Sequence, residues 1–472
     1  MRRCARRVRL GAVVGVLLAA RVSATAPPPN LLVILTDDQR HDALGCAGGP
    51  LPALTPAMDR LAARGLRFRN AFVVLSICSP SRAAVLTGLY GSVNGVVTVG
   101  SARLREGVAT FAQRLRAAGW RTGMAGKWHL GTPPAEAGFD FVAAFHGNGP
   151  WYRRGVVADG VEGVAEGMID EWVAAQTIRF LSEAARDSRP FVFWMCTQLP
   201  HMDDRHEWDV RPESLERFPV ERMPLPATWN DDLTGRPAYL LTARPRLQAR
   251  RYGYDDPEAI RRHIARYLAA VYEVDCAIGR TLDALDRLGL TDRTVVILSS
   301  DNGWLLGEHG LTGKVLPYEE SIRVPLIFAG PGVRRGVEDR FVLNLDLAPT
   351  ISDLAGLSPD PSIHGRSLRP LLAGEPAPEW REEFLYEAPV GQLGVRPLWA
   401  VRTERWKYVR TEDPREPGRI LSEELYDLTA DPLETNNVFV DRRRHDVAGR
   451  MAGQLRRFQV EMERDRERRA GR

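Results

Sequence analysis

The sequence predicts an α/β fold, in which helices sandwich a large, mostly parallel β-sheet and a smaller α+β domain follows at the C-terminus. Three continuous apolar runs, at 31–35, 191–195 and 294–298, are typical of strands buried on both faces of a parallel sheet. Stretches with apolar residues at helical spacing separate these runs, and such alternation indicates layered α/β architecture. A chain of 472 residues is also too long for one ordinary core.

The N-terminal segment, residues 1–26, has the pattern of a signal peptide. An arginine-rich start precedes an apolar run from Leu10 to Ala20, and a small-residue cleavage site follows at Ala24 to Ala26. The apolar run is too short to anchor the chain in a bilayer, so we expect no stable membrane insertion. The chain also has no Asn-x-Ser/Thr acceptor site. We therefore predict a bacterial protein exported to the periplasm or the medium.

Residues 27–373 are predicted to form the large α/β domain. Its helices are expected at 108–118, 171–185 and 259–288, where apolar residues recur at helical spacing. A fourth strand-like run at 324–328 contains a proline, which indicates a sheet edge or the start of a strand. The periodicity disappears between residues 202 and 255, and we interpret this stretch as a long surface insertion near the active site.

Residues 374–472 are predicted to form a separate C-terminal subdomain. Short apolar stretches at 383–386, 400–402 and 406–409 favour a small antiparallel sheet, and the charged stretch 441–467 favours a closing helix. The two segments together predict a small α+β unit packed beside the first domain.

The chain has a small net charge, and nearly all of its positive side chains are arginines. The net charge is only +4, which argues against nucleic acid as the main partner. Lysine occurs three times, at Lys127, Lys314 and Lys407, against 61 arginines. A lysine that persists among so many arginines indicates a site that needs a compact ammonium group. We expect this of Lys127 and Lys314, and we expect Lys407 to be a solvated surface residue.

Oxygen-bearing side chains follow two of the predicted strands. Asp37 and Asp38 come directly after the first strand, and Asp301 and Asn302 follow the strand at 294–298. Parallel strands end at one edge of a sheet, where ligands bind. Such an oxygen set suits a hard cation such as Ca²⁺ or Mg²⁺ better than zinc, and neighbouring aspartates repel each other unless a cation offsets them. Taken alone, the Asp pair could also be a helix cap with an exposed neighbour.

Nucleophile and acid–base candidates lie at comparable positions. Lys127 and His129 follow a short predicted strand at 121–125, and His201 follows the strand at 191–197. Cys78 opens a predicted helix with proline in its first turn. A helix N-terminus attracts anions and should lower the pKa of a thiol, which would make Cys78 a competent nucleophile. The alternative is a buried structural cysteine.

Several segments together resemble the type I sulfatases of the alkaline phosphatase superfamily. The segment Cys78-Ser79-Pro80-Ser81-Arg82 is similar to the Cys-x-Pro-x-Arg motif whose cysteine is oxidised to formylglycine in that family. Segments 35–39, 126–131, 300–303 and 424–437 resemble other family motifs and occur in the same order. The resemblance therefore extends along nearly the whole mature chain.

The resemblance implies a mechanism of sulfate ester hydrolysis. Hydrated formylglycine at 78 would attack sulfur through one oxygen, and loss of the other hydroxyl proton to His129 would expel sulfate. His201 would protonate the leaving alcohol, and Lys127 and Lys314 would stabilise the transferring group. The implied catalytic set is Cys78, Arg82, Lys127, His129, His201 and Lys314, and one Ca²⁺ per chain would be held by Asp37, Asp38, Cys78, Asp301 and Asn302. A formylglycine-generating enzyme is the implied maturation partner.

Two alternatives to this function remain open. The same fold and metal could serve a phosphonate or phosphate ester hydrolase, although most such phosphatases use Ser or Thr and two metals. If Cys78 stays unconverted, the pocket could instead bind anionic sugars. The arginine-rich insertion, with its aromatic residues, favours a sulfated saccharide as substrate or partner. Pocket-lining candidates are His41, Trp151, Tyr152 and residues of the insertion at 202–255, which contains Trp208 and Trp229. His309 is expected to be structural or substrate-facing.

Overall fold

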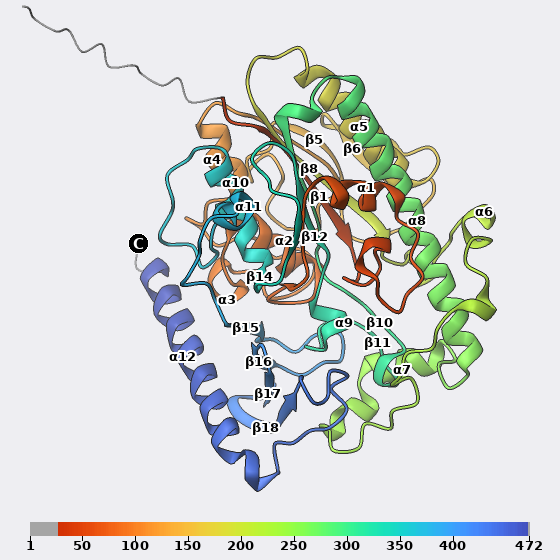
Figure 1. The fold of residues 1–472 in the computed structure, drawn as a ribbon, viewed down its shortest axis with the longest axis vertical. Helices are drawn as coiled ribbons and strands as arrows, with labels where there is room; N and C mark the ends of the chain where they lie inside the picture. The colour runs from red at the N-terminus through yellow and green to blue at the C-terminus, as the bar shows by residue number, and fades with distance from the viewer. Residues whose placement is uncertain (1–26, 471–472) are drawn as a thin grey trace, which may run out of the picture.

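The computed structural model describes residues 27–470 and confirms the predicted α/β fold (Figure 1). The predicted signal peptide, residues 1–26, lies outside the described residues. A ten-stranded sheet forms the centre of the molecule. In spatial order its strands are β13 (Gly336–Glu338), β2 (Leu66–Phe68), β12 (Leu326–Ala329), β9 (Thr294–Ser300), β1 (Asn30–Asp37), β8 (Phe191–Pro200), β4 (Arg121–Lys127), β5 (Phe141–Phe145), β6 (Gly155–Ala158) and β7 (Val161–Val164).

The five strands in the middle of the sheet run parallel. β1 pairs with β8 and β9, and β4 pairs with β8 and β5, so their carboxyl ends meet at one edge. The run at 324–328 behaves differently, because β12 is antiparallel to both neighbours and lies inside the sheet. The expectation of an edge strand was therefore wrong, whereas that of a strand start was right. Pro325 comes one residue before β12, so its missing N–H interrupts no strand pairing.

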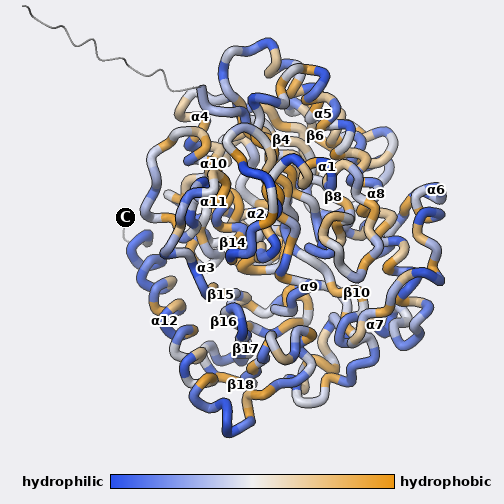
Figure 2. The backbone as a smooth tube through the Cα atoms, in the orientation of Figure 1, coloured by the Kyte–Doolittle hydropathy of each residue, from blue (hydrophilic) through white to orange (hydrophobic). Residues whose placement is uncertain are grey.

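Helices cover both faces of the sheet, as predicted. Leu32 and Ile34 of β1 belong to one apolar core, and Leu31, Val33 and Leu35 belong to the other. Figure 2 shows hydrophobic stretches gathered in the central elements. Burying each such side chain stabilises the fold by about 1.5–3 kcal/mol. The first face is covered by α1 (Pro56–Arg64), α5 (Ile169–Ala184) and α8 (Pro257–Arg287), and the second by α2 (Cys78–Thr87), α4 (Phe111–Ala117) and α10 (Leu347–Leu354).

Two predicted segments differ in detail from the structure. The helix expected from residue 108 begins at Phe111, because Thr110 forms a capping box with Gln113. The insertion at 202–255 is more ordered than its sequence indicated. It contains α6 (Pro212–Leu215), α7 (Arg244–Arg251) and the 3-10 turns 220–222 and 238–242. None of the helices within residues 27–470 combines the length and apolarity needed to cross a bilayer.

The C-terminal subdomain has the predicted α+β composition. An antiparallel sheet of β15 (Glu383–Ala388), β16 (Leu398–Thr403), β17 (Trp406–Asp413) and β18 (Glu416–Asp427) packs against α12 (His445–Ala470), which runs along one side of the molecule (Figure 1). The boundary at 373/374 stays a prediction. The remaining elements are β3 (Ala71–Phe72), α3 (Gly91–Asn94), β10 (Leu305–Leu306), β11 (Thr312–Gly313), α9 (Glu319–Ile322), β14 (Val342–Leu343) and α11 (Arg369–Ala373).

Lys407 is not the solvated surface residue that the sequence predicted. It lies on β17 with only 1% of its surface exposed. Its Nζ lies 2.9 Å from a carboxylate oxygen of Glu319 and 2.7 Å from one of Glu434, and it donates to the carbonyl oxygen of Pro317 at 2.7 Å. Lys407 therefore ties the C-terminal sheet to α9 of the large domain through a buried ion-pair network.

Replacing Lys407 by methionine should destabilise the protein by about 3–5 kcal/mol, because the buried carboxylate of Glu434 loses its cation and Glu319 loses one of its two. Chemical denaturation followed by circular dichroism measures this loss. Arg443→Met removes an exposed arginine that pairs with Asp441, and it serves as a control that should not change stability measurably. Equal stability of the two variants would contradict a structural role for Lys407.

Candidate active site

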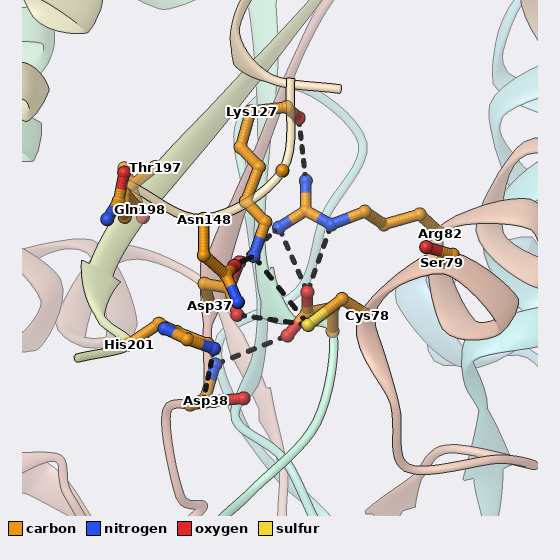
Figure 3. A network of polar contacts seen from close by, with 12 residues as sticks. Asp37, Asp38, Cys78, Ser79, Arg82, Lys127, Asn148, Thr197, Gln198 and His201 are labelled. Carbon is orange, nitrogen blue, oxygen red and sulfur yellow. Dashed lines mark hydrogen bonds and ion pairs between the residues drawn. The ribbon is translucent and has the colours of Figure 1, made fainter. Parts of the chain in front are cut away.

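The carboxyl ends of the parallel strands bring the predicted site residues together (Figure 3). Asp37 is the last residue of β1 and Lys127 is the last residue of β4. His201 follows β8 and Asp301 follows β9. Cys78 faces these strand ends from the first position of α2. Residues that are far apart in the sequence thus form one polar cluster.

Arg82 connects three of these strand ends. One helical turn after Cys78, its guanidinium is fully buried. Nε donates to Oδ2 of Asp301 at 3.0 Å, Nη2 donates to Oδ2 of Asp37 at 3.0 Å, and Nη1 donates to the carbonyl oxygen of Lys127 at 2.8 Å. This arrangement uses the planar fork of arginine, which a lysine could not reproduce.

Both predicted active-site lysines contact Cys78. Lys314 Nζ lies 2.9 Å from Sγ and Lys127 Nζ lies 3.6 Å from it, while the thiol lies 3.5 Å from Oδ1 of Asp37. Lys314 also pairs with Asp38 at 2.5 Å, and Lys127 pairs with Asp37. Two ammonium groups therefore converge on position 78, where they can stabilise an anion bound at this residue.

The environment of Cys78 does not favour a thiolate, contrary to the sequence-based prediction. Burial, followed by the negative charge of Asp37, raises the pKa of the thiol to about 12. Lys127 and Lys314 oppose this shift but do not overcome it. The favourable helix N-terminus was a poor guide here, because desolvation outweighs it. The unmodified side chain is consequently a protonated thiol at neutral pH and a weak nucleophile.

The oxygen-rich end of the cluster fits a divalent cation. The side-chain oxygen Oδ1 of Asn302 is buried and has no hydrogen-bond partner, as a metal ligand would be. Burial raises the pKa of Asp38 to about 7, with Asp37 and Asp301 adding to the shift and Lys314 opposing it. A cation would relieve this repulsion. The pKa of Asp37 instead lies below its usual range, because Lys127 and other positive groups overcome the effect of burial.

The geometry differs in two respects from the predicted metal set, because His201 joins the carboxylates and Asp301 is not in the same close group. Ligand atoms of Asp37, Asp38, Cys78 and His201 all lie within 4.8 Å of one another, so His201 joins the cluster. The imidazole Nε2 is 3.6 Å from Oδ2 of Asp38. Nδ1 lies 2.6 Å from the carbonyl oxygen of Met202, which can only accept, so Nδ1 carries the proton. The Nε2 lone pair of the neutral ring is then available on the side of the cluster.

The two candidate acid–base histidines are both neutral in this environment. Burial, then the positive charge of Lys127, lowers the pKa of His129 to about 2. The same two causes hold the pKa of His201 well below its usual range. Nδ1 of His129 is buried and has no hydrogen-bond partner. A neutral, unpaired imidazole nitrogen can accept a proton, which fits a base better than an acid.

A pocket of about 260 Å³ opens beside Cys78, and it includes residues that the sequence did not reveal. Asn148 is one of them, and its Oδ1 accepts a hydrogen bond of 2.6 Å from Lys127 Nζ. Asn148 follows β5, whose last residue pairs with Lys127. Recognising 141–145 as a strand would have placed it at the same sheet edge. The insertion at 202–255, which was predicted to lie near the active site, supplies five further lining residues: Met202, His206, Arg244, Pro245 and Gln248. The other lining residues, which the sequence did not reveal, are Ile77, Val99, Trp304, Thr312, Gly313 and Leu393.

None of the aromatic or histidine residues singled out as pocket candidates lines this pocket. His41 borders a separate cavity of about 180 Å³. Trp151 is buried and donates from Nε1 to the carbonyl oxygen of His201 at 3.1 Å, so it supports the site from behind. His309 is buried, stacked on Tyr318, and therefore structural. Three further aromatic residues pack in or against the core instead: Tyr152, Trp208 and Trp229.

Comparison with known proteins gives the family of the chain. A sequence model of the sulfatase family matches residues 29–357. A second model, described as N-sulphoglucosamine sulphohydrolase, C-terminal, matches residues 307–461. The chain therefore belongs to the sulfatase family, as a type I sulfatase of the alkaline phosphatase superfamily, and it is a sulfuric ester hydrolase.

Individual relatives share most of the chain. An N-acetylglucosamine-6-O-sulfatase of Bacteroides thetaiotaomicron is 31% identical over 87% of this chain and 82% of its own. A choline-sulfatase of Rhizobium meliloti is also 31% identical, over 88% of this chain and 83% of its own.

Solved structures confirm the fold. A structure in complex with its substrate D-glucosamine-2-N,6-O-disulfate has a TM-score of 0.83 and 28% identity, covering 92% of this chain and 98% of its own. A phosphonate monoester hydrolase of Agrobacterium radiobacter has a TM-score of 0.72 at 24% identity, covering 92% and 96%. At that identity the second likeness concerns the fold alone.

Asn148→Ala should lower kcat/KM for a small aryl sulfate about tenfold, because Lys127 loses the acceptor that holds its ammonium group at the site. Steady-state kinetics measure the effect. Since Asn148 is exposed, the thermal unfolding midpoint of the variant should equal that of the wild type. This measurement separates a positioning role of Asn148 from an effect on stability. Wild-type kinetics in this variant would show that Asn148 does not position Lys127.

Proposed function

We propose that this sulfatase hydrolyses sulfate esters of a saccharide, using a formylglycine generated from Cys78 and one bound Ca²⁺. The observation that carries the proposal is the surrounding of Cys78. Two lysine ammonium groups lie within 3.6 Å of a sulfur whose thiol stays protonated. The site is therefore built to bind an anion at position 78, but it does not make the unmodified cysteine a nucleophile.

Formylglycine at position 78 would supply, in its hydrated form, the oxygen that attacks sulfur and a second hydroxyl whose deprotonation expels sulfate. Lys127 and Lys314 bind and orient the sulfuryl group as fixed point charges. Arg82 holds the carboxylates of Asp37 and Asp301, so that their oxygens face the metal position. These roles match the contacts around Cys78 and Arg82.

His129 acts as the proton acceptor in this proposal. Its pKa, lowered to about 2, keeps the ring neutral throughout the physiological range. His201 donates a proton from Nε2 to the leaving alcohol. That role requires a protonated ring, and the negative charge of a bound sulfate ester favours this state near Nε2. Trp151 and the carbonyl oxygen of Met202 fix the position of His201.

A Ca²⁺ ion would polarise the sulfate group and offset the three carboxylates. The proposed ligands supply mainly oxygen: Asp37, Asp38, Asp301, Asn302 and the modified residue at 78. Oxygen donors favour Ca²⁺ or Mg²⁺ over zinc. The unpaired Oδ1 of Asn302 supports this assignment.

The saccharide substrate rests on the relatives. One acts on an N-acetylglucosamine 6-O-sulfate and one solved structure holds a disulfated glucosamine. We also infer that the chain is exported and that a formylglycine-generating enzyme modifies it. The phosphonate hydrolase alternative has the support of a shared fold, but only one group of candidate metal ligands lies among the described residues.

The protein co-produced with a formylglycine-generating enzyme should carry an aldehyde in the peptide that spans residues 78–82, and only this form should turn over sulfate esters. Peptide mass spectrometry and sulfate release measure both. Cys78→Ser should accept at most one sulfate per chain, because serine has no second hydroxyl with which to expel it. Full turnover by the unmodified thiol form would refute the formylglycine mechanism.

Removing metal with a chelator should abolish sulfate release, and Ca²⁺ should restore it. Adding Ca²⁺ should also raise the thermal unfolding midpoint of the apo protein, which reports binding independently of activity. Asp301→Asn should weaken this shift, whereas Asp441→Asn, which changes a half-buried carboxylate in the C-terminal subdomain, should preserve it. Retained activity after chelation, with no shift on adding Ca²⁺, would overturn the metal assignment.

A further inference from the structure

The charged side chains that line the pocket beside Cys78 are all positive. Its lining includes two permanent cations, Lys314 and Arg244, and no aspartate or glutamate. Lys314 contacts Cys78 and so belongs to the site of sulfate transfer. Arg244 has no contact with that cluster. Its side chain is exposed, and no hydrogen bond or ion pair within residues 27–470 occupies it. An arginine without a partner on the wall of an anion pocket is available for a ligand.

Arg244 is held in place by its backbone. It is the first residue of α7, and Pro245 follows it in the first turn of the helix. The turn of the C-terminal subdomain packs so closely here that a Cβ on Gly394 would come within 2.6 Å of the Cβ of Arg244. Gln392 of this turn donates to the carbonyl oxygen of Val97 at 3.1 Å. Close packing at the pocket rim therefore fixes the position of the Arg244 backbone and Cβ.

We propose that Arg244 binds a second anionic group of the substrate, so that the enzyme prefers saccharides that carry another sulfate or a carboxylate besides the scissile sulfate. This inference rests on the proposed function. Arginine binds such planar or tetrahedral anions through two parallel N–H donors. The scissile sulfate lies at Cys78 and Lys314, and the second anion lies at the outer wall formed by α7.

The remaining lining suits the sugar between the two anions. Trp304 presents a mostly apolar surface, and its ring lies 5.6 Å from Lys314 Nζ. Gln248, one turn after Arg244 on the same side of α7, donates from Nε2 to the hydroxyl of Tyr252 at 2.5 Å, and its Oε1 is left to accept from sugar hydroxyl groups. A quaternary ammonium substrate such as choline sulfate finds no carboxylate in this pocket and meets Arg244, so it should be a poor substrate.

The test compares N-acetylglucosamine 6-sulfate with N-sulfoglucosamine 6-sulfate, using converted, Ca²⁺-loaded full-length enzyme and measuring 6-sulfate release. The wild type should favour the doubly sulfated sugar, and the preference should weaken as salt rises. Arg244→Gln should reduce this preference about tenfold, mainly through a higher KM, because the interaction is equally present in ground and transition states. Arg244→Lys should retain part of it.

Arg250→Gln is the matched control. It removes an exposed arginine from the same helix outside the pocket, and it should leave the preference unchanged. Equal kcat/KM for the two sugars in the wild type, or an unchanged preference in Arg244→Gln, would overturn the inference while leaving the proposed function intact. A wild type that releases sulfate from neither sugar nor aryl sulfates would instead refute the proposed function itself.

Discussion

The buried guanidinium of Arg82 is the interaction on which the site depends. It joins the ends of β1, β4 and β9 through Asp37, the carbonyl oxygen of Lys127, and Asp301. A buried charge of this kind is tolerated only when each donor is satisfied, and loss of one partner costs about 3–5 kcal/mol. Because Arg82 lies one turn after Cys78, the same contact fixes the distance between the start of α2 and the sheet edge.

The positive and negative groups around Cys78 are equal in number, but the carboxylates are not equally compensated. Three carboxylates face three positive side chains: Asp37, Asp38 and Asp301 against Arg82, Lys127 and Lys314. The pKa of Asp37 nevertheless lies below its usual range, whereas that of Asp38 rises to about 7. Asp37 is bound by both Lys127 and Arg82, whereas Asp38 shares its single lysine with the sulfur of Cys78. The under-compensated carboxylate therefore lies at the proposed metal position, and the lysines remain directed at Cys78. The site therefore offers neighbouring positions for a cation and for an anion.

The sequence predicted the residues at strand ends, because parallel strands end at one edge of a sheet and that rule needs no knowledge of side-chain contacts. It missed Asn148 because the five-residue strand before it gives a weak signal. It misjudged Lys407 because the partners of that residue, Glu319 and Glu434, come from segments that only the tertiary fold brings together. The pKa of Cys78 was misjudged for a similar reason, since burial depends on what packs around a helix N-terminus.

Chemistry and selectivity have separate structural sources in this protein. Most groups around Cys78 come from α2 and from strand ends of the central sheet, three of which Arg82 joins, and Lys314 follows β11 of a separate two-stranded sheet. The outer pocket wall comes from α7, the loop before Gly100 and the C-terminal turn around Leu393. Hydrogen bonds of Gln392 with Val97 and Val99 join the turn to the loop. Loops of this kind can change without disturbing the sheet. That division fits the finding that relatives of equal identity are named for substrates as different as a sulfated sugar and choline sulfate. We assign the choice of substrate to the charge of the outer wall rather than to the shared family fold.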